Sequence, residues 1–282
     1  MSKNPVVIVA GPTASGKSSL ALDVAEALGG VVINADSMQV YKSTPIIAAC
    51  PTAADKERVP HRLYEIYDAS VNGTVVDWLE QAAAEIRLAW KEGKLPVVVG
   101  GTGLYLDNLI NGTTPIPEAD ASVRKKVKAR LEETGVQALH AELAKVDPAS
   151  AERLSPNDTT RVTRAYEVFL QTGMPLSEWH KKPLIKKLPE ACFIVIKICP
   201  DATELDERCY LRFDKMMRGG ALEEIRHLAA LGLPRNLPAM KALGVPELLD
   251  FINGKVSLEQ AVELGKLHTR QYAKRQRTWF KG

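Results

Sequence analysis

An eight-residue loop near the start of the chain has the residue types and spacing needed to bind phosphate. It reads Gly11-Pro12-Thr13-Ala14-Ser15-Gly16-Lys17-Ser18, with a short apolar run before it and a helical pattern after it. Glycines in such a P-loop let the backbone wrap around a phosphate with its amide hydrogens pointing inward, and the helix adds the positive end of its dipole. We therefore expect Lys17 to bridge phosphate oxygens and the Ser18 hydroxyl to hold Mg²⁺.

Two more groups of residues follow apolar runs that are typical of buried strands. Residues 31–33 lead into Asn34-Ala35-Asp36-Ser37, and residues 95–99 lead into Gly100-Gly101-Thr102-Gly103. Polar residues just after a strand lie at the rim where α/β proteins bind ligands. Asp36 could reach across the phosphate site there, or it could only form a turn or cap a helix. The glycine loop invites close backbone approach, although loops of this kind are often only tight turns.

A row of basic residues marks the last helical pattern of the chain. The spacing is four, four, three and four residues, which places on one helix face Lys266, Arg270, Lys274, Arg277 and Lys281. Like charges at this spacing repel one another, so an anionic partner would relieve the repulsion. Arg275, Tyr272 and Trp279 lie among them, and no acidic residue follows Glu263. The pattern favours contact with nucleic acid over a merely solvated face.

The elements that must position these residues alternate between strand and helix. Strands are expected at residues 5–10, 31–33, 95–99 and 192–198, and helices at 18–28 and 76–90. Such alternation predicts a parallel, doubly wound sheet. The expected fold class is α/β: a P-loop NTPase-like core with a parallel sheet flanked by helices.

The middle of the chain has a different pattern of apolar residues. After Pro115 and Pro117 the sequence shows helical periodicity without a convincing strand, and the stretch 181–189, rich in lysine, resembles a return linker. We expect an inserted all-helical domain at residues 116–189, between core segments 1–115 and 190–282. From Asp201 onward the chain again reads as helical.

Composition excludes several classes of protein. The net charge of +3 does not by itself indicate a polyanionic partner, and the four cysteines show neither CxxC spacing nor a matching histidine pattern, so neither a zinc site nor a disulfide framework is expected. The first strand begins too early to leave room for a signal peptide, and no apolar run is long enough to span a membrane. A cytoplasmic protein with no membrane contact and no obligate protein partner is expected.

The P-loop alone does not choose among kinases, ATPases, GTPases and transferases. The sequence has no Asn-Lys-x-Asp motif for guanine recognition. No hydrophobic strand ends in the aspartate of a standard Walker B motif, apart from the weaker case of residues 31–36. These features favour a small transferase over a motor or switch ATPase.

Taken together, the motifs resemble the bacterial form of the tRNA dimethylallyltransferase family, also called tRNA isopentenyltransferases. The matching stretches span nearly the whole chain in family order: residues 11–18, 36–42, 60–63, 98–102 with 104–105, 156–158 with Arg161 and Arg164, and 274–279. No single stretch beyond the P-loop is decisive, but their joint occurrence is highly specific. The sequence departs from the family at Ala48-Ala49-Cys50-Pro51, where a run containing a lysine is usual, and at Val245, where a tyrosine is common.

The resemblance implies a reaction and its catalytic residues. A dimethylallyl group would pass from dimethylallyl diphosphate to N6 of adenosine 37, next to the anticodon, and the P-loop would hold the prenyl diphosphate instead of ATP. Asp36 would accept the proton from N6, and Thr102 would contact the reacting region from the other side. Lys17, Arg124 and Arg212 would approach the diphosphate, although Arg212 could equally pair with Glu207 or Glu223 on the surface.

The resemblance also implies how the anticodon stem-loop of tRNA is held. The target adenine must be extruded from its loop into a channel between the core and the inserted domain. The flipped adenine and its neighbours would be read by Asp36, Ser37, Met38 and Gln39, together with Thr102. The RNA backbone would be held by Thr160, Arg161, Val162, Thr163, Arg164, Lys274, Arg275, Gln276 and Arg277.

Three other functions remain open at this level. An adenylate isopentenyltransferase would share the P-loop and the aspartate after the second strand, but it would need neither the inserted basic helices nor the basic C-terminal face. A P-loop small-molecule kinase is a further alternative. An RNA-binding protein with a relic P-loop is disfavoured because Gly16, Lys17, Ser18 and Asp36 are all retained.

Overall fold

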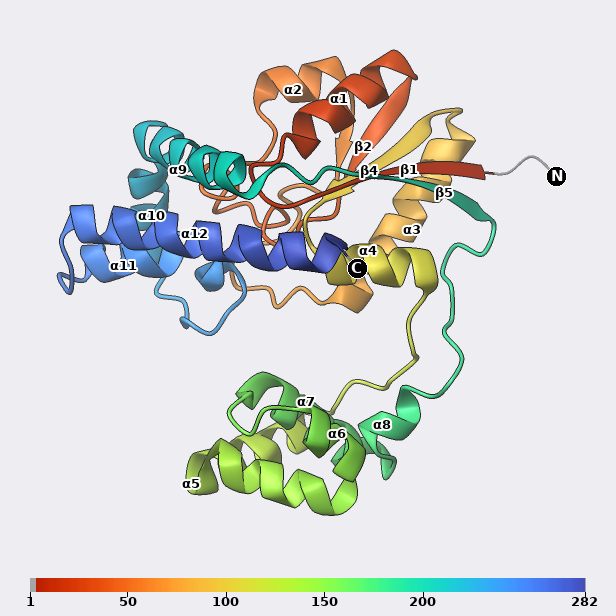
Figure 1. The fold of residues 1–282 in the computed structure, drawn as a ribbon, viewed down its shortest axis with the longest axis vertical. Helices are drawn as coiled ribbons and strands as arrows, with labels where there is room; N and C mark the ends of the chain where they lie inside the picture. Colours follow the sequence, from red (N-terminus) through yellow and green to blue (C-terminus); the bar gives the residue numbers. More distant parts are fainter. Residues whose placement is uncertain (1–3, 282) are drawn as a thin grey trace. The chain divides into compact units, whose positions relative to one another are not determined.

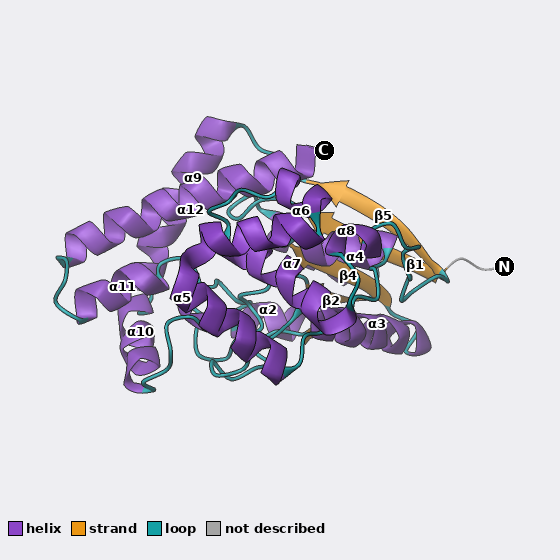
Figure 2. Cartoon of the chain, turned by 90° about the horizontal axis from the view of Figure 1, so that it is seen from below, coloured by secondary structure: helices purple, strands orange, loops and turns teal. Residues whose placement is uncertain are grey.

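The computed structural model describes residues 4–281, which form two compact units (Figure 1). The first unit holds the chain up to Ile110 and from Lys187 onward, and the second holds Asn111–Lys186. The strands belong to the first unit, whereas the described part of the second consists of helices and loops, as the colouring of Figure 2 shows.

A five-stranded parallel sheet forms the centre of the first unit. Its strands are β1 (Asn4–Ala10), β2 (Gly30–Asn34), β3 (His61–Arg62), β4 (Leu95–Gly100) and β5 (Ala191–Lys197), in the order β3-β2-β4-β1-β5. The helices are α1 (Lys17–Ala27), α2 (Ala53–Arg58), α3 (Val75–Lys91), α4 (Gly103–Asn111), α9 (Ala202–Arg218), α10 (Ala221–Ala230), the 3₁₀ helix η1 (Ala239–Lys241), α11 (Val245–Ile252) and α12 (Leu258–Lys281). The predicted parallel α/β fold is confirmed.

Both faces of the sheet are covered by helices, which explains why its central strands are apolar throughout. Side chains alternate along a strand: in β1, Val6 and Ile8 face the cluster built by α3 and α4, whereas Val7 and Val9 face α1. Figure 1 shows α1 on one side of the sheet and α3 on the other. The continuous apolar runs in the sequence therefore report a sheet buried on both sides.

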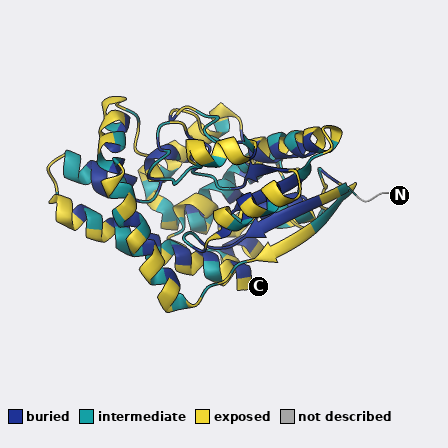
Figure 3. Ribbon diagram, turned by 90° about the horizontal axis from the view of Figure 1, so that it is seen from above, coloured by how far each residue is buried: buried dark blue, intermediate teal, exposed yellow. Residues whose placement is uncertain are grey.

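Strand β5 ends the sheet and returns the chain to the P-loop. It pairs with β1 along its whole length, from Asn4↔Ala191 to Ala10↔Lys197. Its C-terminal half, residues 194–197, is exposed (Figure 3), and 51% of the surface of Ile194 is accessible. Beyond the strand, the Ile198 amide donates to the Ala10 carbonyl at 2.8 Å. This pairing delivers the start of α9 beside the phosphate-binding loop.

Helices α9 to α12 form a second core around one aromatic ring. Phe213 of α9 is buried among side chains of α10, α11 and α12. A Cβ added at Gly265 of α12 would lie 2.3 Å from the ring, and one at Gly244 would lie 2.9 Å from it. Glycine at these two positions lets the ring lie directly against the backbone.

The second unit has its own small helical core. Its helices are α5 (Ala121–Val146), α6 (Pro148–Arg153), α7 (Thr159–Thr172) and α8 (Leu176–Trp179), and α5 is interrupted at Gly135, whose φ is 79°. Val127, Leu139 and Leu143 of α5 pack on Val162 and Ala165 of α7. None of the helices within residues 4–281 is both long enough and apolar enough to cross a membrane.

The contact between Gly265 and Phe213 predicts the sign of a stability change. On helix propensity alone, Gly265→Ala would stabilise α12 by about 1 kcal/mol. Because the new methyl group overlaps the Phe213 ring, we expect destabilisation by about 1–3 kcal/mol instead. Urea unfolding measures this change, and adding Phe213→Leu should restore part of the stability. Greater stability of Gly265→Ala than of the parent would contradict the packing described here.

Candidate active site

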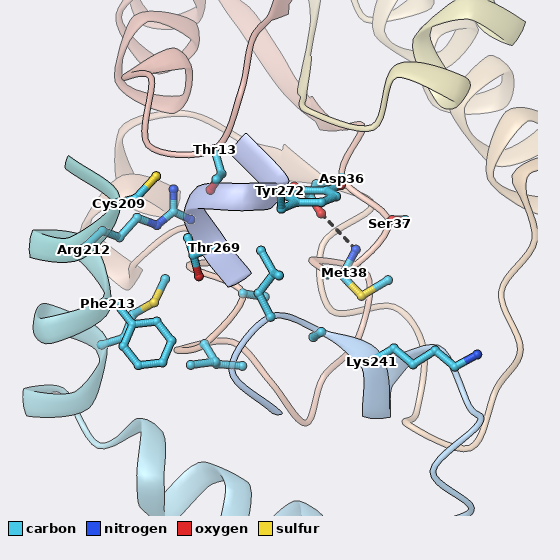
Figure 4. Close-up of a pocket in the computed structure, with 15 residues that line it drawn as sticks. Thr13, Asp36, Ser37, Met38, Cys209, Arg212, Phe213, Lys241, Thr269 and Tyr272 are labelled. Atoms are coloured by element: carbon cyan, nitrogen blue, oxygen red, sulfur yellow. Dashed lines mark hydrogen bonds between the residues drawn. The ribbon is translucent and has the colours of Figure 1, made fainter. Parts of the chain in front are cut away.

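A cavity of about 270 Å³ lies at the carboxyl ends of the parallel strands, where the loops after β1 and β2 face α9 and α12 (Figure 4). One part of its wall is polar, with Thr13, Asp36, Ser37, Arg212, Thr269 and Tyr272. Another part is apolar, with Met38, Ile47, Phe213, Met216 and Leu243. The cavity thus has charged groups at one end and an apolar surface beside them.

The loop after β1 has the backbone conformation of a phosphate cradle. Gly16 adopts φ 90° directly before α1, and Ala14 is also left-handed at φ 61°. The Ser15 amide donates to the Pro12 carbonyl at 3.3 Å, which closes the turn. The first amides of α1 have no acceptor within the helix, so they are available to an anion held in the loop.

Lys17 is buried inside this loop, with only 7% of its surface exposed. Its ammonium donates to the Pro12 carbonyl at 3.2 Å. Burial lowers the pKa of Lys17 to about 8, and the neighbouring Arg212 guanidinium contributes to that lowering, whereas the Asp36 carboxylate opposes the shift. A buried ammonium whose charged form is disfavoured by burial and by a neighbouring cation is stabilised when an anion binds beside it.

A buried asparagine fixes the loop that carries Asp36. The Asn34 side chain accepts from the Asp36 amide at 2.8 Å and donates to the carbonyls of Asp36 and Leu63, each at 3.0 Å. The Met38 amide donates to Asp36 Oδ1 at 2.9 Å. Asp36 therefore forms a turn and also lines the cavity, which combines the two roles that its position suggests.

Thr102 joins the loop after β4 to the loop after β2. The Ser37 amide donates to Thr102 Oγ1 at 3.0 Å, and the Thr102 amide donates to the Ala35 carbonyl at 3.3 Å. At Gly100 an added Cβ would lie 2.1 Å from the Ala35 carbonyl oxygen. The glycine loop thus allows the two strand-end loops to touch.

Helix α9 supplies the cations opposite the P-loop. Arg212 lines the cavity, and burial lowers its pKa while the Asp36 carboxylate opposes that change. Of the two proposed surface partners, Glu223 lies near Arg226 and His227, whereas Arg212 faces the cavity (Figure 4).

Arg208, one helical turn before Arg212, was not predicted. Its guanidinium donates to the Ser15 carbonyl at 3.5 Å and pairs with Glu204. The spacing of four residues between the two arginines was the available signal. Thr269 and Tyr272 of α12 also line the cavity without having been singled out for that role.

Two glutamines expected to contact tRNA have their side-chain amides inside the protein. Gln39 is 8% exposed and donates to the carbonyls of Ala48 and Ala49 at 3.0 and 2.8 Å. Gln276 is 6% exposed, accepts from the Thr13 amide at 2.8 Å and donates to the Gly101 carbonyl at 2.7 Å. In this structure both amides hold neighbouring loops, and contact of the two residues with tRNA stays a prediction.

The basic row on α12 is neutralised over its first half. Lys266 lies 2.9 Å from Asp214 of α9, and Arg270 lies 3.9 Å from Asp206 of the same helix. The expectation that this row needs an external anion to relieve its repulsion is therefore corrected for these two residues. Lys274 and Arg275 are exposed further along the helix.

The predicted residues of the second unit lie on α5 and α7. Arg124 pairs with Glu118 at 2.9 Å, Arg161 with Asp158 at 3.2 Å, and Arg164 donates to the Pro117 carbonyl at 3.3 Å. Thr160 is exposed and the Thr163 hydroxyl is buried. Val162 is fully buried in the helical core, which corrects the expectation that it touches RNA.

A second cavity, of about 300 Å³, lies beside Ser18, whose hydroxyl was expected to hold Mg²⁺. Cys50 and His61 contribute to its wall. Burial raises the pKa of the Cys50 thiol to about 12. The side chain is therefore neutral within residues 48–51, the stretch in which members of the family usually have a lysine. Among residues 4–281, no group of three His, Cys, Asp or Glu side chains is placed to hold a metal ion.

Comparison with known proteins places these features in one family. The family model described as IPP transferase matches residues 39–282. A protein named tRNA dimethylallyltransferase from Rhodopseudomonas palustris (strain BisB18) is 50% identical over 275 residues, which cover 98% of this chain and 87% of the relative. A protein of the same name from Nitrobacter hamburgensis is also 50% identical over 275 residues, with the same coverage.

Solved structures are similar over nearly the whole chain. The full-length tRNA isopentenylpyrophosphate transferase from Bacillus halodurans is 35% identical, with a TM-score of 0.68 over 99% of this chain and 88% of that one. A eukaryotic dimethylallyltransferase acting on tRNA is 32% identical, with a TM-score of 0.84 over 98% of this chain and 69% of that one. The P-loop, the strand-end loops and the helices facing them are thus those of a chain that belongs to the IPP transferase family.

Proposed function

We propose that the protein transfers a dimethylallyl group from dimethylallyl diphosphate to N6 of adenosine 37 in tRNA, with release of pyrophosphate. The observation that carries this proposal is a cavity with an apolar wall that Arg212 and Asp36 line, beside the P-loop whose Lys17 interacts electrostatically with both of them. Proteins named tRNA dimethylallyltransferase have 50% sequence identity to this chain. A tRNA substrate puts the reaction in the cytoplasm.

The cationic end of the cavity suits a departing diphosphate. As the bond between the allylic carbon and the bridging oxygen breaks, the electron pair passes to pyrophosphate, whose charge Lys17 and the amides at the start of α1 would stabilise. Arg212 faces the same space from α9. The apolar wall, with Met38, Phe213 and Met216, suits a small hydrocarbon group.

Mg²⁺ fits this site only together with the substrate. Ser18 is exposed beside the loop, and no metal-binding cluster exists within the described residues. Mg²⁺ commonly keeps several waters and binds substrate phosphates with few protein ligands. The Ser18 hydroxyl and the diphosphate oxygens would hold the ion, which would neutralise charge on the leaving group.

Asp36 is placed to receive the proton that the amine loses. When N6 forms its bond to the allylic carbon, the nitrogen becomes positively charged and must release a proton. The Asp36 carboxylate lines the cavity, and its Oδ1 accepts from the Met38 amide. The other oxygen is the candidate acceptor, while Thr102 fixes the backbone beside it through Ser37.

Cations on both units suit the backbone of the anticodon stem-loop. Lys274, Arg275 and Arg277 follow one another on α12, and Arg161 and Arg164 lie on α7. Phosphate contacts from such residues position an RNA without reading its sequence. Contact of Arg124 of α5 with the diphosphate stays a prediction from the family resemblance.

Incubation with dimethylallyl diphosphate that carries a label in its hydrocarbon part tests the proposal. The acceptors are unmodified tRNA with adenosine at positions 36 and 37, AMP and ATP. Label should appear in tRNA, together with an equal amount of pyrophosphate. Label in AMP or ATP and none in tRNA would instead indicate an adenylate isopentenyltransferase, and phosphoryl transfer from ATP would indicate a kinase.

Asp36→Asn separates the base from the turn that the same residue forms. The Asn side chain keeps an acceptor for the Met38 amide but loses the basic carboxylate, so the single-turnover rate should fall by roughly 10²–10⁴-fold. Binding of the tRNA stem-loop should change little. An unchanged single-turnover rate would remove Asp36 from the role of base.

The low pKa of Lys17 predicts how pyrophosphate binding depends on pH. Below pH 8 the free ammonium is charged and attracts the anion, and above pH 8 it loses its proton unless the anion holds it. The dissociation constant of inorganic pyrophosphate should therefore rise by about tenfold from pH 7 to pH 9 beyond the rise seen for Lys17→Arg, which does not titrate in this range. Calorimetric titration of both proteins measures the difference. Parallel curves would contradict it.

The C-terminal half of the α12 row, where Lys274 is exposed and Arg277 is half-buried, predicts a change in salt dependence. Lys274→Glu with Arg277→Glu should weaken tRNA binding and flatten the slope of log affinity against log salt by about 0.7–0.9 for each phosphate that is no longer neutralised. Lys91→Glu is the control for a change of charge away from the cavity. Lys91 is the last residue of α3, and the neighbouring Trp90 donates to the Pro5 carbonyl at the amino end of β1, whereas the cavity lies at the carboxyl ends of the strands. Identical filter-binding curves for the double variant and the parent would mean that this face is only solvated.

A further inference from the structure

Helix α12 presents two different faces at its C-terminal half. One face points into the protein: Thr269 and Tyr272 line the cavity, and Gln276 is buried beyond them. The other face carries the exposed cations Lys274 and Arg275. The same segment of the helix, residues 269–276, therefore borders both the cavity and the surface proposed for RNA.

The Gln276 side chain connects two of the strand-end loops. Its carbonyl oxygen accepts from the Thr13 amide of the P-loop at 2.8 Å, and its amide nitrogen donates to the Gly101 carbonyl at 2.7 Å. Gly101 immediately precedes Thr102. Both hydrogen-bonding groups of the glutamine are thus used on backbone atoms of strand-end loops, and one of these residues, Thr13, lines the cavity.

The helix is seated tightly on these loops. A Cβ at Gly101 would lie 2.3 Å from Gln276 Nε2, and one at Gly103 would lie 2.2 Å from Trp279 Nε1. Ala14 of the P-loop packs against Leu205, Cys209 and Ala273. A shift of α12 along or about its axis would therefore move the P-loop and the Thr102 loop with it.

The geometry points to Gln276 as a positioning residue that couples RNA binding on α12 to diphosphate binding in the P-loop. This inference rests on the proposed function. A diphosphate that fixes the loop also fixes Thr13, and through Gln276 it fixes the segment of α12 that presents the cations. The RNA then binds to a helix that is already ordered, and each substrate strengthens binding of the other by the same factor.

Binding measurements without turnover test the coupling. The dissociation constant of an anticodon stem-loop with adenosine 37 is measured in Mg²⁺ with and without saturating inorganic pyrophosphate. The ratio of the two constants is the coupling factor, which is expected to be at least about fivefold for the parent protein. Gln276→Met keeps the length of the side chain but removes both hydrogen bonds to the loops, so its ratio should fall below about twofold.

The matched control is Gln271→Met, which makes the same chemical change on the exposed side of α12 and should keep the parent ratio. A role in stability alone would lower the melting temperature of Gln276→Met and weaken both ligands, but it would leave the ratio unchanged. Gln276→Asn, too short to span both loops, carries the test if the Met variant is unfolded at the assay temperature.

A parent ratio near one, or an equal ratio in the parent and in the Gln276 variants, would overturn the inference. A failure of this inference can be distinguished from a failure of the proposed function. A parent protein that prenylates the stem-loop but shows no coupling leaves the function standing and removes the role of Gln276. A parent that binds and modifies no tRNA fails at the earlier step.

Discussion

Two cations and one carboxylate interact where the P-loop meets the cavity, Lys17 within the loop and Arg212 and Asp36 on the cavity wall, and the rest of the structure is arranged around that constraint. Burial lowers the pKa of both Lys17 and Arg212, the Arg212 guanidinium lowers that of Lys17 further, and the Asp36 carboxylate opposes both shifts. A diphosphate supplies the missing negative charge when it binds, and it takes that charge away when it leaves as pyrophosphate. The P-loop is therefore better understood as a grip on a leaving group than as a site for phosphoryl transfer from ATP.

Holding like charges together requires a rigid frame, which the parallel sheet provides. Because β1, β2 and β4 run in the same direction, the P-loop, the Asp36 loop and the Thr102 loop emerge at one edge. Pairing of β5 with β1 brings α9 and its Arg212 to the same place. The close contact at Gly100 and the buried amide of Asn34 fix the distances between these loops.

Much of this arrangement was predictable from the sequence, and the part that was not has a physical reason. The four apolar strands and the P-loop were identified because a buried parallel strand needs a continuous apolar run, whereas β3 has only His61 and Arg62 and gives no such signal. Gln39 and Gln276 were expected to contact tRNA because the resemblance to the family places both in tRNA-binding stretches. Which way an amide points depends on tertiary contacts, as does the pairing of Lys266 with Asp214.

The central claim concerns what the P-loop holds. The most direct test is a crystal structure with a dimethylallyl diphosphate analogue whose bridging atom resists cleavage. We predict that the diphosphate contacts the amides of residues 14–18 and the Lys17 ammonium, with the allylic carbon facing Asp36 in the cavity that Arg212 lines. A diphosphate bound away from the loop, or a dimethylallyl group directed into the second cavity beside Ser18 and His61, would contradict this account.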